Sequence, residues 1–280
     1  MWLDWTYAVM LAAVIGVATA AARDVKQPFL VKARPFGIET SLIFALYAIW
    51  QIAGQASVLK IDHALERGQQ IWDLERDLHF LSERTVQQWV LPHRWLVQFC
   101  NGYYAIMHVP SLVFFLVWLF VKHRSRYGSI RNTLAMLTGI CLAIQLIPVA
   151  PPRLVVGIGV VDTPALYDQS VYGAVGTGVA DQLSAMPSVH VGWAVLIATG
   201  TLVVSRGRWR WIAVLHASLT IFAVVATGNH FWLDGVVSVA IMFVIMGMQK
   251  VGRLWWKRTR STGAAGGSSA PSPAPASVNA

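Results

Sequence analysis

The feature that most constrains this chain is the length of its apolar blocks. Several of them exceed the roughly 18 residues that mark a membrane-spanning helix. Of the 280 residues, 56% are hydrophobic and only 12% are charged. A soluble domain of this size normally carries about twice that charged fraction. The chain is therefore predicted to be an integral membrane protein with an all-α fold.

The apolar blocks predict a polytopic helix bundle with about seven spans. The spans are expected near residues 5–22, 36–57, 95–121, 131–150, 188–205, 211–228 and 231–249. The chain also holds 13 Trp residues, and indole rings favour the boundary between lipid and water. We interpret the Trp residues as membrane anchors.

Basic residues are distributed unevenly between the loops. If successive loops alternate between the two sides of the membrane, one side receives 16 of the 22 basic residues and 2 of the 13 acidic residues. Its basic residues are Arg23, Lys26, Lys32, Arg34, Lys122, Arg124, Arg126, Arg131, Arg206, Arg208, Arg210, Lys250, Arg253, Lys257, Arg258 and Arg260. Cytoplasmic loops carry such an excess of Lys and Arg, so this side is predicted to be cytoplasmic. The net charge of +9 is then explained by the orientation of the chain in the membrane, and we expect no nucleic-acid partner.

The segment 60–92 differs from the spans. It mixes charged residues with Ile71, Leu74, Leu78 and Leu81, which recur at helical spacing. This pattern predicts either a helix that lies in the outer membrane interface or a helix that packs on a loop.

The remaining features are a long connection between spans, the C-terminal segment and two cysteines. The connection 151–187 is the longest between spans and is rich in Gly and Pro, and long connections are often functional. After Arg260 the chain consists mainly of Ser, Ala, Gly and Pro, which predicts disorder. Cys100 and Cys141 lie in apolar segments and form no metal-binding spacing.

Two short motifs contain the ionisable residues that we expect to do chemistry. The first is MPSVH at 186–190, which ends in His190 and stands at the start of a span. Pro and Ser suit a helix N-terminus, whose free backbone N–H groups can hold an anion. The second is GNHFWLD at 228–234. Its His230 and Asp234 share one face of a predicted helix, where the carboxylate can fix the imidazole tautomer.

Spacing brings these motifs to the same face of the membrane. His190 and His230 are 40 residues apart, which allows one span inward, a short turn at 206–210 and one span back, since about 20 residues cross the hydrocarbon. Arg153 follows a span that ends on that face too. Together these residues have the composition of a phosphate site, because Arg offers a planar fork, one His can attack phosphorus and the other can protonate the leaving oxygen. The alternative for Arg153 alone is an interface anchor.

Three polar residues in the third span are further candidates. Asn101, Tyr104 and His108 are spaced i, i+3 and i+7, so they share a face of a continuous helix. They are predicted either to line a substrate cavity or to form hydrogen bonds between helices. The other histidines are interpreted as interfacial packing: His63, His79, His93, His123 and His216.

At these motifs the sequence resembles the type 2 phosphatidate phosphatase superfamily, whose pattern is K-x6-R-P, then P-S-G-H, then S-R-x5-H-x3-D. PSVH at 187–190 matches the second element with Val in place of Gly, and His230 and Asp234 match H-x3-D. The Arg of the third element is replaced by Val224, and no K-x6-R-P exists; PPR at 151–153 occupies that region. These departures are more similar to the branch that contains fungal inositol phosphorylceramide synthase and, more distantly, sphingomyelin synthase. The resemblance covers about residues 95–250.

The resemblance implies a role for each matching residue. His230 would be the nucleophile that forms a phosphohistidine, Asp234 would orient it, and His190 would be the general acid. No metal or other cofactor is implied. With the two cationic positions missing, we expect Arg153, Asn229 and the backbone near Ser188 to bind the phosphate.

The expected organisation is an N-terminal span and cytoplasmic loop (1–35), a membrane catalytic domain built on six spans (36–250), and a basic, then disordered, cytoplasmic tail (251–280). The expected activity is transfer of a phosphoryl or inositol-phosphate-type head group from a lipid phosphate to a lipid alcohol. The alternatives are a lipid phosphatase acting on phosphatidate-like or polyprenyl (pyro)phosphate substrates and a non-enzymatic lipid transporter. We expect the plasma membrane, with the site facing its extracytoplasmic side.

Overall fold

The computed structural model describes residues 4–56, 63–169 and 182–265. In chain order its α-helices are α1 (Trp5–Ala21), α2 (Pro28–Ala56), α3 (Ala64–Asp77), α4 (Glu83–Val90), α5 (Arg94–Ile106), α6 (His108–Lys122), α7 (Arg124–Gln145), α8 (Thr163–Leu166), α10 (Val189–Val204), α11 (Arg210–Ala226) and α12 (Trp232–Ala265). Within the described ranges there is no β-strand. The predicted all-α fold is confirmed.

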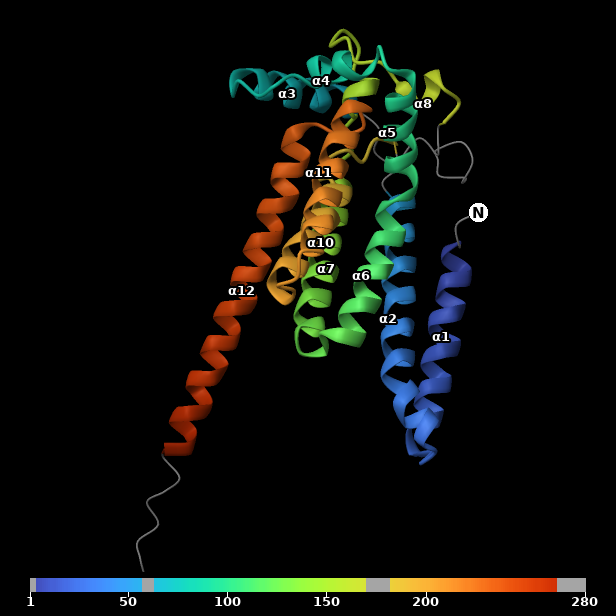
Figure 1. Ribbon diagram of the computed structural model, residues 1–280, viewed down its shortest axis with the longest axis vertical. Coiled ribbons are helices and arrows are strands. Elements are labelled where there is room, and N and C mark those ends of the chain that lie inside the picture. Colours follow the sequence, from blue (N-terminus) through green and yellow to red (C-terminus); the bar gives the residue numbers. More distant parts are fainter. Residues whose placement is uncertain (1–3, 57–62, 170–181, 266–280) are drawn as a thin grey trace, which may run out of the picture.

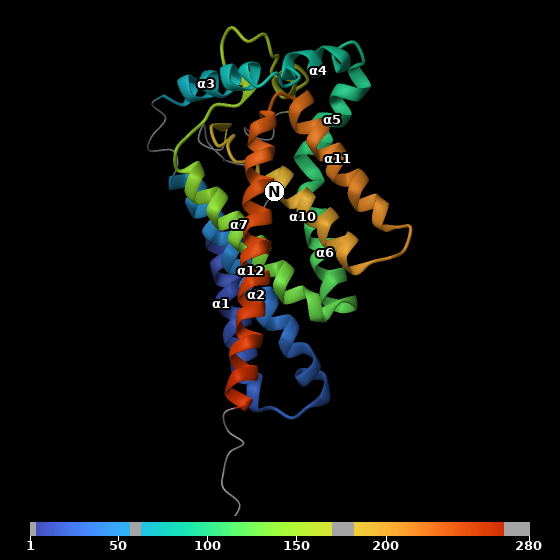
Figure 2. The same cartoon turned by 90° about the vertical axis from the view of Figure 1, so that its left-hand side faces the viewer.

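The long helices form a bundle that is capped at one end (Figures 1 and 2). Helices α6, α7, α10 and α12 enclose the main core, where Leu119, Leu137, Leu196 and Met242 are at most 1% exposed. Helices α5 and α11 pack on α10 and α4 to form a second cluster. The α1–α2 hairpin lies beside α7, and α3 and α4 lie across the upper end in Figure 1.

Two glycines let α10 lie close to its neighbours. A Cβ at Gly192 would overlap Ser238 Oγ of α12, and one at Gly200 would lie 2.7 Å from the Phe115 ring of α6. Helix association in lipid depends on close van der Waals packing, because lipid tails are as apolar as the side chains they would exchange for. These contacts place the start of α10 against α12.

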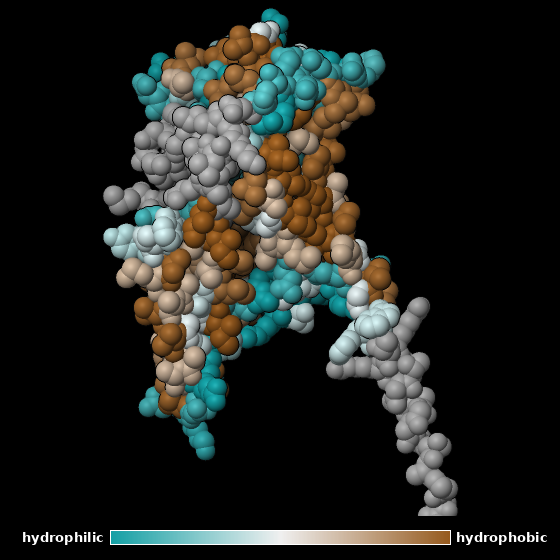
Figure 3. Space-filling model, turned by 180° about the vertical axis from the view of Figure 1, so that it is seen from behind, coloured by the Kyte–Doolittle hydropathy of each residue, from teal (hydrophilic) through white to brown (hydrophobic). Residues whose placement is uncertain are grey.

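The surface is that of an integral membrane protein. Hydrophobic side chains form a band below the hydrophilic upper cap and above a second hydrophilic layer (Figure 3). Among the described residues, two helical stretches are long and apolar enough to cross a membrane, Trp5–Asp24 and Trp232–Trp256, and the bent pair α5–α6 makes a third if it counts as one span. Helices α10 and α11 are shorter apolar helices.

Each of the seven predicted spans corresponds to a helix or a helix pair, but several boundaries were wrong. Helix α2 begins at Pro28, so Lys32 and Arg34 lie in its first turns and not in a loop. Helix α12 continues to Ala265, past the predicted span end and into the segment predicted to be disordered. The rest of that segment, 266–280, lies outside the described residues.

The third predicted span is broken. Helices α5 and α6 meet at an angle of 50°. Pro110 stands in the first turn of α6, and a proline cannot donate a backbone hydrogen bond to the carbonyl four residues earlier, with which its ring also clashes. Asn101 and Tyr104 lie together on α5, but His108 lies beyond the break, so the three residues do not share a face of one continuous helix as their spacing had predicted.

The segment predicted to lie in the interface or on a loop forms α3 and α4. Ile71 packs against the cluster formed by the 150–158 loop and Phe231, so α3 does pack on the long connection. Leu74, Leu78 and Leu81 remain about half exposed. Residues 60–62 lie outside the described part of the chain.

The basic loops and the two histidine motifs lie at opposite ends of the bundle. The turns after α1, α6 and α10 and the end of α12 lie at the lower end in Figure 1, whereas α12 begins at the upper end (Figures 1 and 2). Glu39, one of the two acidic residues assigned to the basic side, pairs with Arg131 of that side. The loops thus alternate between the two ends as the charge distribution predicted.

Candidate active site

His230 and Asp234 are in contact just before and within the first turn of α12. Nδ1 of His230 lies 2.8 Å from the Ala185 carbonyl oxygen and 3.2 Å from Asp234 Oδ2. Because both neighbours are acceptors, Nδ1 carries the proton and Nε2 carries the lone pair. His230 is 4% exposed, and its Nε2 has no hydrogen-bond partner among the described residues. Among the described residues nothing binds Nε2, so its lone pair is suited to nucleophilic attack.

Backbone contacts join the two motifs. The Ser188 N–H donates to the Asp234 carbonyl oxygen at 3.0 Å, and the Ser188 hydroxyl caps α10 by accepting from the Val191 N–H at 3.3 Å. The Phe231 N–H donates to Asp234 Oδ2 at 2.8 Å. Asp234 is fully buried. It thus orients His230 through its side chain and holds the start of α10 through its backbone.

His190 lies opposite His230 within a group of rings. The His190 and His230 ring centroids are 5.5 Å apart. Tyr104 lies 4.6 Å and His108 4.4 Å from the His190 ring. A small cavity of about 10 Å³ beside His190 is lined by Tyr103, Tyr104, His108, His190, Thr220, Ala223 and Val224. This volume is about the minimum that holds one water molecule.

Arg153 lies against the turn that precedes His230. Its backbone N–H donates to the Gly228 carbonyl oxygen at 2.9 Å. Its Nε donates to Asn229 Oδ1 at 3.0 Å and its Nη1 to Asp162 Oδ2 at 2.8 Å. Gly228 has a φ of 69°, and a Cβ there would lie 3.2 Å from the Arg153 Cβ. The structure therefore brings both Arg153 and Asn229 next to the motif, with the guanidinium buried and oriented.

Asn101 is separated from the other candidates of the third predicted span. Its Nδ2 donates to Gln169 Oε1 at 3.1 Å, and its Oδ1 accepts from the Thr163 hydroxyl at 2.9 Å. Both partners belong to the long connection. Asn101 thus fastens this connection to α5, while Tyr104 and His108 reach His190.

Sequence reasoning missed Gln145 at the end of α7. Its Nε2 donates to the Pro187 carbonyl oxygen at 2.8 Å and to that of Ser184 at 3.2 Å. These bonds fix the turn that leads into His190. The available signal was a single polar residue in the apolar run before Pro148.

His216 is not merely an interfacial residue. Its Nδ1 lies 2.6 Å from the Tyr103 hydroxyl and its Nε2 lies 3.1 Å from the Ser111 hydroxyl. Both ring nitrogens are thus used between α11 and the α5–α6 pair. In contrast, His123 stacks edge-on against Trp118 at 4.7 Å, as interfacial packing predicts.

The comparisons with known proteins agree with this geometry. The family model of the PAP2 superfamily matches residues 69–248. The match begins earlier than residue 95, where the resemblance was thought to start, and so includes most of α3 and all of α4. Neither the comparison with curated proteins nor that with solved structures gave a match. Because the family match covers more than half of the chain, this integral membrane protein belongs to the PAP2 superfamily and is an enzyme of the phosphatase and phosphotransferase class that the superfamily comprises.

Proposed function

We propose that this enzyme is a lipid phosphotransferase that works through a phosphohistidine on His230. It would transfer a phosphoryl or inositol-phosphate-type head group from a lipid phosphate to a lipid alcohol. The observation that carries the proposal is the orientation of His230, whose Nδ1 is bound by Ala185 and Asp234 while Nε2 has no partner among the described residues.

In the first half-reaction, His230 Nε2 attacks phosphorus and the bond to the leaving oxygen breaks. His190 donates a proton to that oxygen, so the lipid leaves as a neutral alcohol. Asp234 stabilises the positive charge that develops on the His230 ring. Arg153, Asn229 and the backbone near Ser188 would hold the phosphoryl oxygens, with Tyr104 and His108 forming the wall behind His190.

In the second half-reaction, His190 removes a proton from the acceptor hydroxyl, which attacks phosphorus and releases His230 Nε2. An alcohol acceptor is favoured by the resemblance of the PPR and PSVH segments to the branch that contains inositol phosphorylceramide synthase. If water were the acceptor, the same residues would make a lipid phosphatase, which is the alternative activity. Membership in a family of phosphatases and phosphotransferases argues against the non-enzymatic transporter.

We further propose that catalysis occurs on the extracytoplasmic side of the plasma membrane. The catalytic motifs lie at the end of the bundle opposite the basic loops (Figures 1 and 2), and basic loops are retained in the cytoplasm.

The test of the mechanism is His230→Ala, with His63→Ala as the control, because His63 lies at the same end of the bundle and its side chain is 67% exposed. His230→Ala is expected to abolish turnover and the formation of a base-stable, acid-labile phosphoprotein, since loss of a covalent nucleophile typically lowers kcat by about 10⁴-fold or more. Residual activity within about tenfold of wild type would remove His230 from this role.

The test of the acceptor is product analysis by mass spectrometry with a panel of lipid phosphates, with and without lipid alcohols. A phosphotransferase should give a new phospholipid whose yield depends on the added alcohol. Release of inorganic phosphate at the same rate with or without the alcohol would establish the phosphatase instead.

A further inference from the structure

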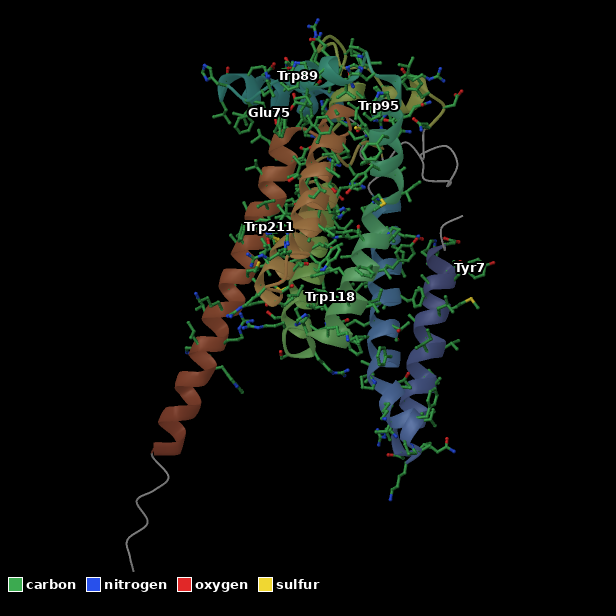
Figure 4. The ribbon with its side chains drawn as sticks, in the orientation of Figure 1. Tyr7, Glu75, Trp89, Trp95, Trp118 and Trp211 are labelled. Atoms are coloured by element: carbon green, nitrogen blue, oxygen red, sulfur yellow. The ribbon has the colours of Figure 1, made fainter. Side chains whose placement is uncertain are left out.

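The cap of the bundle is formed by α3 and α4. Two of its glutamates accept hydrogen bonds from the first turn of α12, the helix that carries Asp234. Glu75 of α3 accepts the Leu233 N–H through Oε1 at 2.7 Å, and Glu83 of α4 accepts the Trp232 N–H through Oε1 at 3.4 Å. N–H groups in the first turn of a helix have no partner within the helix, and its dipole favours negative charge there. Glu75 lies where α3 meets the start of α12 (Figure 4). The cap thus holds α12 by side chains about 150 residues earlier in the chain.

The two glutamates form one buried group with Arg76. Both carboxyl groups are fully buried, and Arg76 Nη2 lies 3.5 Å from Oε2 of each. Burial and a hydrogen bond to Glu83 raise the pKa of Glu75 to about 9, and the negative charge of Asp234 acts in the same direction. At neutral pH, Glu75 therefore keeps its proton.

This group is continuous with the catalytic residues. Three successive N–H groups, those of residues 231–233, donate to Asp234, Glu83 and Glu75 in that order. The N–H that Asp234 accepts follows His230 directly. A shift of the first turn of α12 would therefore change the contact between Asp234 and His230, which depends on the same turn.

We propose that Glu75 and Glu83 are positioning residues, a buried carboxyl pair whose hydrogen bonds to the Leu233 and Trp232 N–H groups hold the first turn of α12 so that Asp234 stays against His230. This inference rests on the catalytic role proposed for His230. The groups that face Glu75 are Glu83 from α4, Arg76 from α3 itself and Asp234 from α12. Loss of the Glu75 proton would place a further negative charge beside Glu83 and Asp234, which both oppose it, and the repulsion would loosen the turn.

The proton also makes stability depend on pH. Burial and the neighbouring acids raise the pKa of Glu75 in the folded protein to about 9, from 4.5 for an unperturbed glutamate. The folded state thus binds more protons between these values, so the contribution of Glu75 to stability falls as pH rises from about 4.5 to about 9 and is constant above that. Glutamine has the shape of a protonated glutamate and cannot lose the proton. Glu75→Gln should therefore remove this dependence.

The experiment compares wild type with Glu75→Gln, Glu75→Ala and the control Glu66→Gln, an acid of the same helix that is 70% exposed. For each purified protein, kcat and KM are measured from pH 6 to 10, and the thermal midpoint is measured over the same range. Glu75→Gln should keep kcat within about threefold at pH 7 and should not lose activity near pH 9 as wild type does. Its thermal midpoint should decline less with pH than that of wild type. Glu75→Ala should lower kcat at least about tenfold, with a smaller change in KM, because misplacement of catalytic groups slows the chemical step.

The inference is overturned if Glu75→Gln keeps the wild-type pH dependence of the thermal midpoint, or if Glu75→Ala keeps wild-type kcat. It is also overturned if Glu66→Gln changes both profiles as Glu75→Gln does, since the effect would then not belong to the buried pair. The His230→Ala variant tests the proposed function independently of this inference. An inactive His230→Ala beside a fully active Glu75→Ala rejects only the positioning role, whereas an active His230→Ala rejects the catalytic assignment itself.

Discussion

At the residue scale, the chemistry depends on which nitrogen of His230 carries the proton. Two acceptors, one backbone and one side-chain, lie within 3.2 Å of Nδ1. The Ala185 carbonyl comes from the turn before α10, so the tautomer is set partly by the other motif. The tautomer that the proposed mechanism requires is therefore set only when both motifs are folded together.

Arg153 provides the test of phosphate binding at this scale. Arg153→Lys keeps the charge but cannot bind Asn229 and Asp162 at once, because an ammonium lacks the planar fork of a guanidinium. We expect kcat/KM to fall by about 10- to 100-fold, which corresponds to about 1.4–2.7 kcal/mol of transition-state stabilisation. Steady-state kinetics with the lipid phosphate, alongside the thermal midpoint, would measure this. If Lys substitutes freely, Arg153 is an anchor and the phosphate is bound elsewhere.

At the scale of elements, the surroundings of His190 depend on contacts that α5, α6 and α7 make with α10 and with the turn before it. Gln145 at the end of α7 donates to two carbonyl oxygens of the turn that leads to His190. The α5–α6 kink brings Tyr104 and His108 to the same ring. Positions on three helices thus define the surroundings of His190.

Gln145→Leu tests the contribution of α7. The substitution leaves two backbone carbonyls without their donor, and a buried polar group that loses its partner costs about 1–3 kcal/mol. We expect a lower thermal midpoint and a reduced kcat, because the turn that positions His190 loosens. Ile144→Leu, at a 38% exposed position of the same helix, is the control and should match wild type. An unchanged kcat in Gln145→Leu would show that α10 alone positions His190.

At the scale of the whole molecule, the bundle places its basic loops at one end and the two motifs proposed to be catalytic at the other (Figures 1 and 2). Ser125 lies in the first turn of α7 at the basic end, and Asp168 lies in the long connection; both are exposed. The native Cys100 and Cys141 are buried. Single introduced cysteines can therefore report on each end.

A membrane-impermeant thiol reagent applied to intact cells should label Asp168→Cys and not Ser125→Cys, because the positive-inside rule retains the basic end in the cytoplasm. Both variants should be labelled after the membrane is permeabilised. Labelling of Ser125→Cys alone in intact cells would reverse the topology and the predicted leaflet of the substrate.

The sequence by itself determined that this is a membrane protein with an all-α fold, and it gave the approximate position of every long helix. The reason is that the length of an apolar segment and the charges of its flanking loops are local properties of the chain, and these properties govern how a segment inserts into a membrane. It also predicted that His230 and Asp234 lie within side-chain reach, which the structure confirms, although His230 precedes α12 and the two do not share a face of one helix. The family membership followed from the same two motifs and is shown over residues 69–248.

Only the tertiary structure decided how the site is held. Asn101 binds the long connection, whereas Tyr104 of the same helix and His108 beyond the break both lie against His190. The periodicity of a single segment does not predict which partner each of these residues meets. Glu75 appeared in the sequence as one charge on an amphipathic helix, yet it is fully buried against α12. The physical reason is that a carboxyl group becomes tolerable in a buried site only when donors from distant segments meet it there, and those donors are assembled by packing between helices.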